Sequence, residues 1–575
     1  MTQICTDKII SANIMRIGKN ILIAVSLLIS SVVFGQGDVL KGWHLLDAQK
    51  DSFNGISIAK TYDFLKGKKS KQVIVAVIDS GVDTTHEDLK SVLWHNPKEI
   101  PGNGIDDDNN GYVDDIYGWN FLGGKDGRNV KTESAEASRI YHRYKNKFSN
   151  KQVNEAQLVG DEKEQYELWK QASDIINAKP EEQVELMFLE MAYKAVKKHE
   201  KVLRDEMKKD EFKVSDVEKF SPPTSQGQKA KLGYLTFMKL TEIDSEETNT
   251  TTFSQLEEYI EQKKKALEAK DVEPENHREE IVKDNYYNLN DRFYGNSDVM
   301  GPSPLHGTHV CGIIGEKRGN GIGGDGIADD VKIMMIRAVP DGDEYDKDIA
   351  LAIKYAVDNG AKVINMSFGK GLSPEKKWVD DAVRYAELKD VLIVHAAGND
   401  GENTDSTGNF PNPELKQLNR KASNFITVGA STDPKISGDY IADFSNYGKN
   451  TVDVFAPGVK IYSTLPGGNT YGFLKGTSMA SPVVAGVAAV IRSYFPDLSA
   501  KQVKYAIEKS ATEDTVQVVQ PGTKDHKPVS ELCRAGGWIN AYNAVKVAAT
   551  LQPEKKELKK EILPRATFKN QPIKP

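Results

Sequence analysis

Short apolar segments alternate with helix-like patterns through the second half of this chain. Strands are indicated at 331–338, 363–369 and 391–397, and helices at 346–359 and 374–388. This alternation is typical of units in which helices cover a parallel sheet. We therefore predict an α/β fold of three layers, with a doubly wound, mostly parallel sheet between helices.

An earlier apolar run, Val73 to Ile78, predicts one more buried strand, and Asp79 follows it directly. In open parallel sheets, groups that bind or react gather at the carboxyl ends of the strands. Asp79 is therefore a candidate for such a group. An aspartate at a strand end is also consistent with a simple turn residue.

A run of small and apolar residues at 483–491 predicts a buried helix, and Gly-Thr-Ser-Met-Ala-Ser-Pro precedes it. Pro482, the last of these, fits the first turn of the helix, where no N–H is needed. Ser478 would then lie at the helix N-terminus, where free N–H groups and the helix dipole stabilise negative charge. A serine in this place could cap the helix, or it could attack a carbonyl and hold the resulting oxyanion.

Two further stretches carry residues that could serve such a serine. His306 opens the stretch His-Gly-Thr-His-Val-Cys-Gly, and Asn399 follows a strand-like run in His-Ala-Ala-Gly-Asn-Asp. Together with the stretches around Asp79 and Ser478, these motifs resemble those of the subtilisin-like serine proteases. The order Asp, His, Ser along the chain is the order found in that family.

The resemblance implies a serine endopeptidase that hydrolyses peptide bonds in polypeptide substrates through an acyl-enzyme. Ser478 would be the nucleophile, His306 the general base, and Asp79 the carboxylate that orients the imidazole. Asn399 would bind the oxyanion together with the backbone N–H of Ser478. The alternative is a catalytically idle protein of the same fold that acts as a binding module.

The predicted strand that ends in Ser367, Phe368 and Gly369 resembles the Asn-Met-Ser-x-Gly segment of the family. In the family an extended substrate pairs with this segment as an added β-strand and places a side chain in a specificity pocket. The resemblance therefore implies that these three residues bind the substrate.

The resemblance also implies a structural calcium site. Asp88 lies in the family pattern Asp-x-x-x-His-x-Asp-Leu, and Asn320 lies in a glycine-rich loop after the His306 helix. In relatives the corresponding aspartate and asparagine help to bind the ion, and oxygen ligands are what calcium prefers. The glycine-rich loop could instead serve only as a turn.

A second calcium site is indicated by the residues themselves. Asp106, Asp108 and Asn110, followed by Gly111, satisfy the pattern D-x-[DN]-x-[DN]-G, and Asp114 takes the ninth position. The twelfth position is not a glutamate, so another side chain would have to complete the coordination. The alternative is an acidic loop exposed to solvent.

Residues 1–35 have the pattern of a secretory signal peptide. Arg16 and Lys19 precede an apolar run at 21–34 that is short for a membrane span. We therefore predict export to the periplasm or the extracellular space. An uncleaved N-terminal anchor is the alternative. We expect residues 36–70 to form a lead-in that packs on the catalytic domain.

The catalytic domain is predicted at 71–125 and 291–551, interrupted by a segment of different composition at 126–290. Within it, 60 of the 160 residues at 131–290 are charged, and several stretches have helical periodicity. We predict a charged, mostly helical insertion. It could be a stabilising cap, or a lid or docking site for a protein partner.

Composition limits the remaining possibilities. The net charge of −7 disfavours nucleic acid as a partner, and no segment after the N-terminus is long and apolar enough to span a membrane. We expect a monomer. Residues 552–575 are rich in Lys, Glu and Pro and predict a loose tail.

Overall fold

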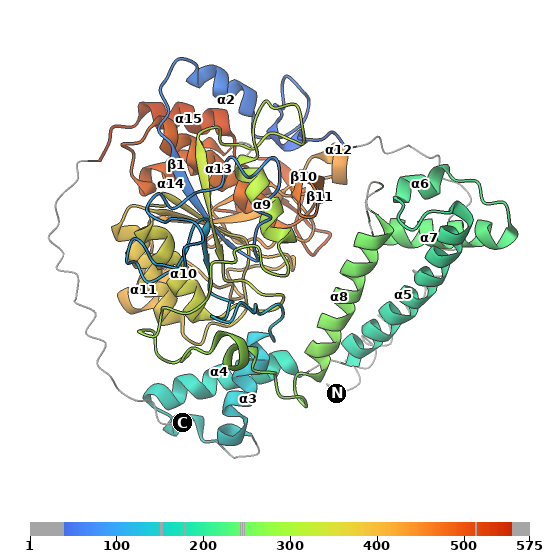
Figure 1. The fold of residues 1–575 in the computed structure, drawn as a ribbon, viewed down its shortest axis with the longest axis horizontal. Coiled ribbons are helices and arrows are strands. Elements are labelled where there is room, and N and C mark those ends of the chain that lie inside the picture. Colours follow the sequence, from blue (N-terminus) through green and yellow to red (C-terminus); the bar gives the residue numbers. More distant parts are fainter. Residues whose placement is uncertain are drawn as a thin grey trace. The chain divides into compact units, whose positions relative to one another are not determined.

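The computed structural model describes residues 39–554, apart from 150–152, 178–179, 242, 244, 246–247 and 512–514. The predicted signal peptide and most of the predicted tail lie outside the described residues. The chain divides into two units, 1–40 and 41–575, and the second unit is described below (Figure 1). No helix in the described part of the chain is long and apolar enough to cross a membrane.

A seven-stranded sheet forms the centre of the fold, and every neighbouring pair of its strands is parallel. The strands stand in the order β2 (Gly118–Asn120), β3 (Val331–Arg337), β1 (Val73–Asp79), β4 (Val363–Met366), β5 (Leu392–Ala396), β8 (Phe425–Ser431) and β9 (Val454–Pro457). Chain order reverses between β1 and β4, which is the kind of place where ligands bind in such sheets.

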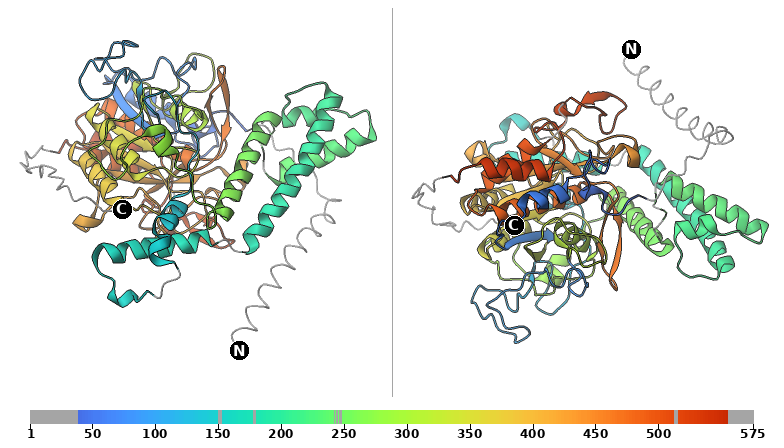
Figure 2. Two further views of the ribbon diagram at one scale, coloured as in Figure 1. Left: turned by 60° about the horizontal axis from the view of Figure 1, so that its bottom comes forward. Right: turned by 90° about the horizontal axis from the view of Figure 1, so that it is seen from above.

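Helices cover both faces of this sheet (Figures 1 and 2). One face carries α9 (Leu305–Gly315), α13 (Thr477–Tyr494), α14 (Ala500–Ser510) and α15 (Ala541–Thr550), and the other carries α10 (Asp346–Asp358) and α11 (Lys376–Leu388). The predicted α/β class with a doubly wound, mostly parallel sheet is therefore confirmed.

The strand residues are apolar without alternation because both faces are covered. In β1, Ala76 and Ile78 belong to the hydrophobic cluster that includes α10 and α11, whereas Val75 and Val77 are buried on the opposite side. The buried helix α13 packs closely on its neighbours through small residues. At Gly486 an added Cβ would lie only 2.7 Å from the Cβ of Ile327.

The remaining short elements lie outside the seven-stranded sheet. Two antiparallel hairpins, β10–β11 and β12–β13, and the short pair β6–β7 are formed. The bounds are η1 (Trp43–Leu45), α2 (Ile58–Leu65), β6 (Glu414–Leu415), η4 (Lys416–Leu418), β7 (Arg420–Lys421), α12 (Pro434–Ser437), β10 (Ile461–Leu465), β11 (Thr470–Leu474), β12 (Gln517–Val519), β13 (His526–Pro528) and η5 (Val529–Glu531).

Trp43 and helix α2, near the start of the second unit, pack on the α/β domain. The Trp43 side chain is fully buried, and its Nε1–H donates to the carbonyls of Val459 and Lys460 at 3.1 Å each. Helix α2 contacts α15 near the other end of the chain. An indole removed from water in this way is held by both packing and hydrogen bonding.

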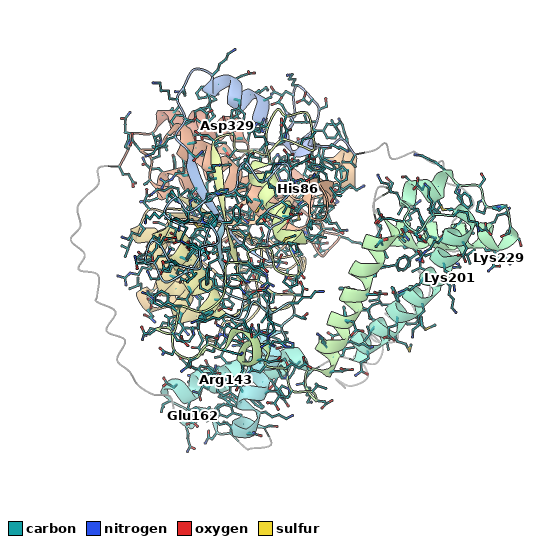
Figure 3. The ribbon with its side chains drawn as sticks, viewed as in Figure 1. His86, Arg143, Glu162, Lys201, Lys229 and Asp329 are labelled. Atoms are coloured by element: carbon teal, nitrogen blue, oxygen red, sulfur yellow. The ribbon has the colours of Figure 1, made fainter. Side chains whose placement is uncertain are left out.

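The segment between β2 and α9 is mostly helical. It contains α3 (Glu136–Phe148), η2 (Glu155–Gln157), α4 (Gly160–Ile176), α5 (Pro180–Met207), α6 (Val214–Lys219), α7 (Ser225–Leu240), α8 (Asn249–Glu268) and the π-helical turn η3 (Arg278–Val282). Helices α5 to α8 share one hydrophobic cluster, whereas α3 and α4 belong to another. Charged side chains such as Lys201 on α5 and Lys229 on α7 are exposed (Figure 3).

Residues near the two ends of this segment are buried against the α/β domain. Arg278 is 4% exposed and forms ion pairs with Asp284 and with Asp348 of α10, at 2.6 and 2.7 Å. Near the other end, Glu136 of α3 pairs with Lys370 at 2.6 Å, and both are buried. From the composition we expected this segment to bury few residues in the α/β core. That expectation fails at the ends, because the charges there are paired and buried.

We therefore expect that helices α5 to α8 can be deleted without loss of the fold, whereas the whole segment between β2 and α9 cannot. The Nζ of Lys270 lies 2.9 Å from the Oδ1 of Asn177, so the chain segments on either side of residues 178–268 lie close together. A short Gly/Ser linker can therefore replace these residues. The entropy of loop closure grows only slowly with length. We expect this variant to unfold cooperatively near the wild-type temperature in a thermal melt.

The control is replacement of residues 131–285 by the same linker. That deletion removes Arg278 and Asp284 and so takes away the ion-pair partners of two buried charges, Asp348 and Lys347, which is strongly destabilising. If both deletion variants fold, or if the smaller deletion alone fails, this division of the segment is wrong.

Candidate active site

Three of the predicted site residues lie at the carboxyl edge of neighbouring strands. Asp79 is the last residue of β1, Ser367 directly follows β4, and Asn399 follows β5 by three residues. They gather where the chain order of the sheet reverses, as expected for a site in an open parallel sheet. Two helices supply the other partners.

His306, the second residue of α9, is joined to Asp79. The Nδ1 of His306 lies 2.7 Å from the Oδ1 of Asp79, whose carboxylate is buried and also accepts the N–H of Ser80 at 2.7 Å. An ionised carboxylate can only accept, so Nδ1 carries the proton and Nε2 is the basic nitrogen. Desolvation of the partly buried ring lowers the pKa of His306, but the charge and hydrogen bond of Asp79 outweigh it and raise the pKa above the ordinary 6.5.

Ser478 is the second residue of α13 and lies among the free N–H groups of its first turn. Its Oγ donates to the carbonyl of Ser367 at 3.0 Å, and the Oγ of Ser367 donates to the carbonyl of Ser478 at 2.9 Å. This reciprocal pair fixes the start of α13 against the end of β4. Among the described residues, the hydroxyl of Ser478 makes no hydrogen bond to His306.

The side chain of Asn399 is oriented by Thr477. The Oδ1 of Asn399 accepts the N–H of Thr477 at 2.8 Å and its hydroxyl at 3.0 Å. In the described parts of the chain nothing accepts a hydrogen bond from Nδ2, so this donor is available to a ligand. The sequence did not lead us to the part played by Thr477, although its place beside Ser478 was a possible signal.

Asn446 supports the turn that carries Asn399. Its Oδ1 accepts the N–H groups of Asp400 and Glu402 at 3.0 and 2.9 Å, and its Nδ2 donates to the carbonyl of Ala397 at 3.0 Å. These bonds span the turn from both sides. No local sequence signal marks Asn446, because it lies far from the turn along the chain.

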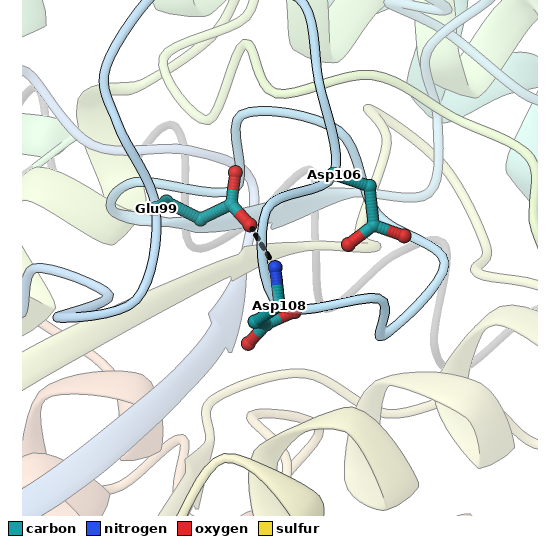
Figure 4. A group of neighbouring side chains, drawn as sticks. All are labelled: Glu99, Asp106 and Asp108. Carbon is teal, nitrogen blue, oxygen red and sulfur yellow. Dashed lines mark hydrogen bonds between the residues drawn. The ribbon is translucent and has the colours of Figure 1, made fainter.

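The acidic loop brings together two predicted ligands and one that was missed. Carboxylate oxygens of Glu99, Asp106 and Asp108 lie within 4.8 Å of one another (Figure 4). One oxygen of Glu99 accepts the N–H groups of Asp107 and Asp108 at 3.0 and 3.2 Å, while its Oε2 is buried without a partner. Burial raises the pKa of Glu99. Glu99 precedes the motif, so the spacing rule could not find it.

Asp114 and Asn110 bond within the loop instead. The carboxylate of Asp114 accepts the N–H groups of Gly102 and Gly104 at 2.8 and 2.9 Å. The Oδ1 of Asn110 accepts the N–H of Tyr112 at 2.8 Å. Asp114 therefore braces the loop away from the cluster, and Asn110 offers its oxygen to the backbone.

The other predicted pair of ligands is brought together. The amide of Asn320 donates to Asp88, which is fully buried. Beside them Glu316, also buried, has an Oε2 without a partner, and burial holds its pKa well above the usual range. Glu316 was not among the predicted ligands. A buried, uncompensated carboxyl next to Asp88 is suited to a bound cation.

Comparison with known proteins decides the family. The profile of the subtilase family matches residues 70–532. The chain belongs to the subtilase family. This subtilase is 39% identical over 241 residues to a thermophilic serine proteinase of Bacillus sp. (strain AK1), a match that covers 42% of this chain and 52% of that protein. It is 38% identical over 241 residues to thermitase of Thermoactinomyces vulgaris, covering 42% and 74%.

A third relative is a cell wall-associated protease of Bacillus subtilis (strain 168). This subtilase is 34% identical to it over 278 residues, covering 47% of this chain and 29% of the relative. The chain thus matches about half of the first of these relatives (52%) and less than a third of the cell wall-associated one.

Proposed function

We propose that the protein is an exported serine endopeptidase. The observation that carries the proposal is the hydrogen bond between Asp79 and His306 at the sheet edge, with Ser478 at the mouth of a buried helix. Labelling with a fluorophosphonate tests it, because such reagents react with an activated serine.

In the proposed reaction the Oγ of Ser478 attacks the scissile carbonyl while Nε2 of His306 takes its proton. Asp79 keeps the imidazole in the required tautomer and stabilises it once charged. The N–H of Ser478 and the Nδ2 of Asn399 bind the oxyanion. His306 then protonates the leaving amine, and water hydrolyses the acyl-enzyme by the same steps. The hydroxyl of Ser478 must first release the carbonyl of Ser367 and turn toward His306. Hydrogen bonds between catalytic side chains are often long without substrate and tighten only when substrate is bound.

The pH dependence should follow His306. The base must be neutral, so activity is lost as pH falls through its pKa. Because Asp79 raises that pKa, the acidic limb of kcat/KM should have its midpoint above 6.5. A profile of kcat/KM from pH 5 to 9 with a peptide substrate measures it. A midpoint at or below 6.5 would show that the Asp79 interaction does not govern the base.

Polypeptides are the proposed substrates, bound as an added strand along Ser367, Phe368 and Gly369. The pattern of residues 1–35 supports export to the periplasm or the extracellular space, and one relative is named as cell wall-associated. Mass spectrometry of the mature protein should find an N-terminus near Gln36. A mature chain that begins before Ile21 would contradict export by cleavage.

Structural calcium is proposed at the cluster of Glu99, Asp106 and Asp108, and at Asp88 with Asn320. A ligand that binds only the folded state stabilises it by about 2.7 kcal/mol at a hundred times its dissociation constant. We expect the melting temperature to be higher in millimolar calcium than in chelator, and Asp108→Asn to reduce this difference.

Asp114→Asn is the matched control for the acidic loop. Its carboxylate braces the same loop but faces away from the cluster, so the variant should keep the calcium-dependent shift even if its stability falls in both buffers. A wild-type melt that is unchanged by calcium would reject both sites.

A binding role for the helical segment is the second candidate. Helix α5 exposes Val184, Met187, Phe188 and Met191, at helical spacing, each about half exposed. A row of this kind favours contact with a protein partner. If the fluorophosphonate fails to label the wild-type protein, the binding role becomes the better explanation.

A further inference from the structure

His395 is a buried histidine that the proposed mechanism does not use. It lies on β5, is 1% exposed, and places its Nε2 2.7 Å from the carbonyl oxygen of Phe368. A carbonyl can only accept, so Nε2 must carry the proton. Burial lowers the pKa of His395 to about 4, so the ring is neutral where His306 titrates.

This hydrogen bond sets the direction of the peptide unit between Phe368 and Gly369. In a planar trans peptide the C=O and the following N–H point in opposite directions. Because the carbonyl of Phe368 points at His395, the N–H of Gly369 points away from β5. No described residue accepts a hydrogen bond from that N–H.

Ser367 shows which edge of this segment the free N–H of Gly369 faces. In an extended chain, backbone groups of alternate residues share one edge. The carbonyl of Ser367 accepts the hydroxyl of Ser478 at 3.0 Å, so Ser367 presents its carbonyl to the proposed nucleophile. Gly369, two residues further on, presents its N–H to the same edge.

We propose that His395 is a positioning residue for substrate binding, which holds the carbonyl of Phe368 so that the N–H of Gly369 can bind a backbone carbonyl of the substrate. This inference rests on the proposed function. In this role His395 acts through the peptide unit between Phe368 and Gly369 and does not touch the reacting atoms.

The test compares substrates of different length in the full-length protein. In His395→Leu the donor is lost at similar volume, and kcat/KM for an extended peptide anilide should fall about tenfold, mainly through KM, as for one lost hydrogen bond. Hydrolysis of p-nitrophenyl acetate, which is too small to reach Gly369, should change less than about twofold on the same reasoning. His395→Gln, which keeps an N–H donor, should recover most of the loss.

Val428→Ala on β8 is the matched control, because it removes buried packing without touching the segment 367–369. It should leave the ratio of the two activities unchanged. Equal loss on both substrates in His395→Leu would mean that His395 only stabilises the fold. No hydrolysis by the wild-type protein would instead reject the proposed function.

A structure of Ser478→Ala protein with a bound peptide gives a second readout that does not depend on His395 variants folding. The peptide carbonyl should lie within hydrogen-bonding distance of the Gly369 N, with Phe368 still bonded to His395. A complex in which the Gly369 N–H makes no bond to the peptide would overturn the inference.

Discussion

Replacing His306 by alanine is expected to lower peptide turnover by about 10⁶-fold, which is the size of the loss that subtilisin shows when its catalytic histidine is removed. The reason is that Ser478 has no other base to take its proton. Asp79 is buried and accepts the N–H of Ser80, and among the described residues it makes no hydrogen bond to Ser478, so it cannot substitute. Steady-state hydrolysis of a peptide anilide measures the loss.

The fold should survive this change. The His306 side chain is 36% exposed, so its removal leaves no closed cavity in the core. The matched control is His526→Ala, a histidine that is exposed on β13 and should leave turnover unchanged. If His306→Ala retained more than about a hundredth of wild-type turnover, far above the loss expected for a general base, the assignment of the base would be wrong.

Replacing Arg278 by alanine is expected to destabilise the protein by about 3–5 kcal/mol. The carboxylate of Asp348 is bonded to the guanidinium of Arg278 and to the hydroxyl of Tyr294, and only the guanidinium brings positive charge. Its removal leaves two fully buried carboxylates, Asp284 and Asp348, with Lys347 alone to balance them. Desolvated charges without partners are costly.

Urea unfolding of both proteins measures this difference. Lys201→Ala is the control, because Lys201 is exposed on α5 and should change the free energy of unfolding by less than about 0.5 kcal/mol. A loss below about 1 kcal/mol in Arg278→Ala, as for an exposed ion pair, would mean that this end of the helical segment is not an integral part of the α/β domain.

Local motifs allowed the sheet, and the places of the candidate site residues within it, to be predicted. The apolar run before Asp79 marks a strand because both of its faces are buried, and its end marks the sheet edge. The four stretches at Asp79, His306, Asn399 and Ser478 each carry several motif residues within a few positions. Their positions along the strands and helices follow from these local patterns.

What could not be predicted depends on contacts between distant segments. Glu99 and Thr477 take part in the candidate sites because of the direction in which their side chains point. That direction is set by the fold of a loop and by the start of a helix. Arg278 looked like a surface residue because composition counts charge but not pairing. The hydrogen bond from His395 to Phe368 joins β5 to the segment that follows β4, and no single stretch of sequence reveals that these two come together.

The most direct test of the central claim is to treat the mature protein with a fluorophosphonate and locate the modified residue by mass spectrometry of its peptides. We expect one labelled peptide, modified at Ser478, with labelling slowed strongly in His306→Ala and absent in Ser478→Ala. Labelling at another residue, or none at all in folded wild-type protein, would contradict the claim.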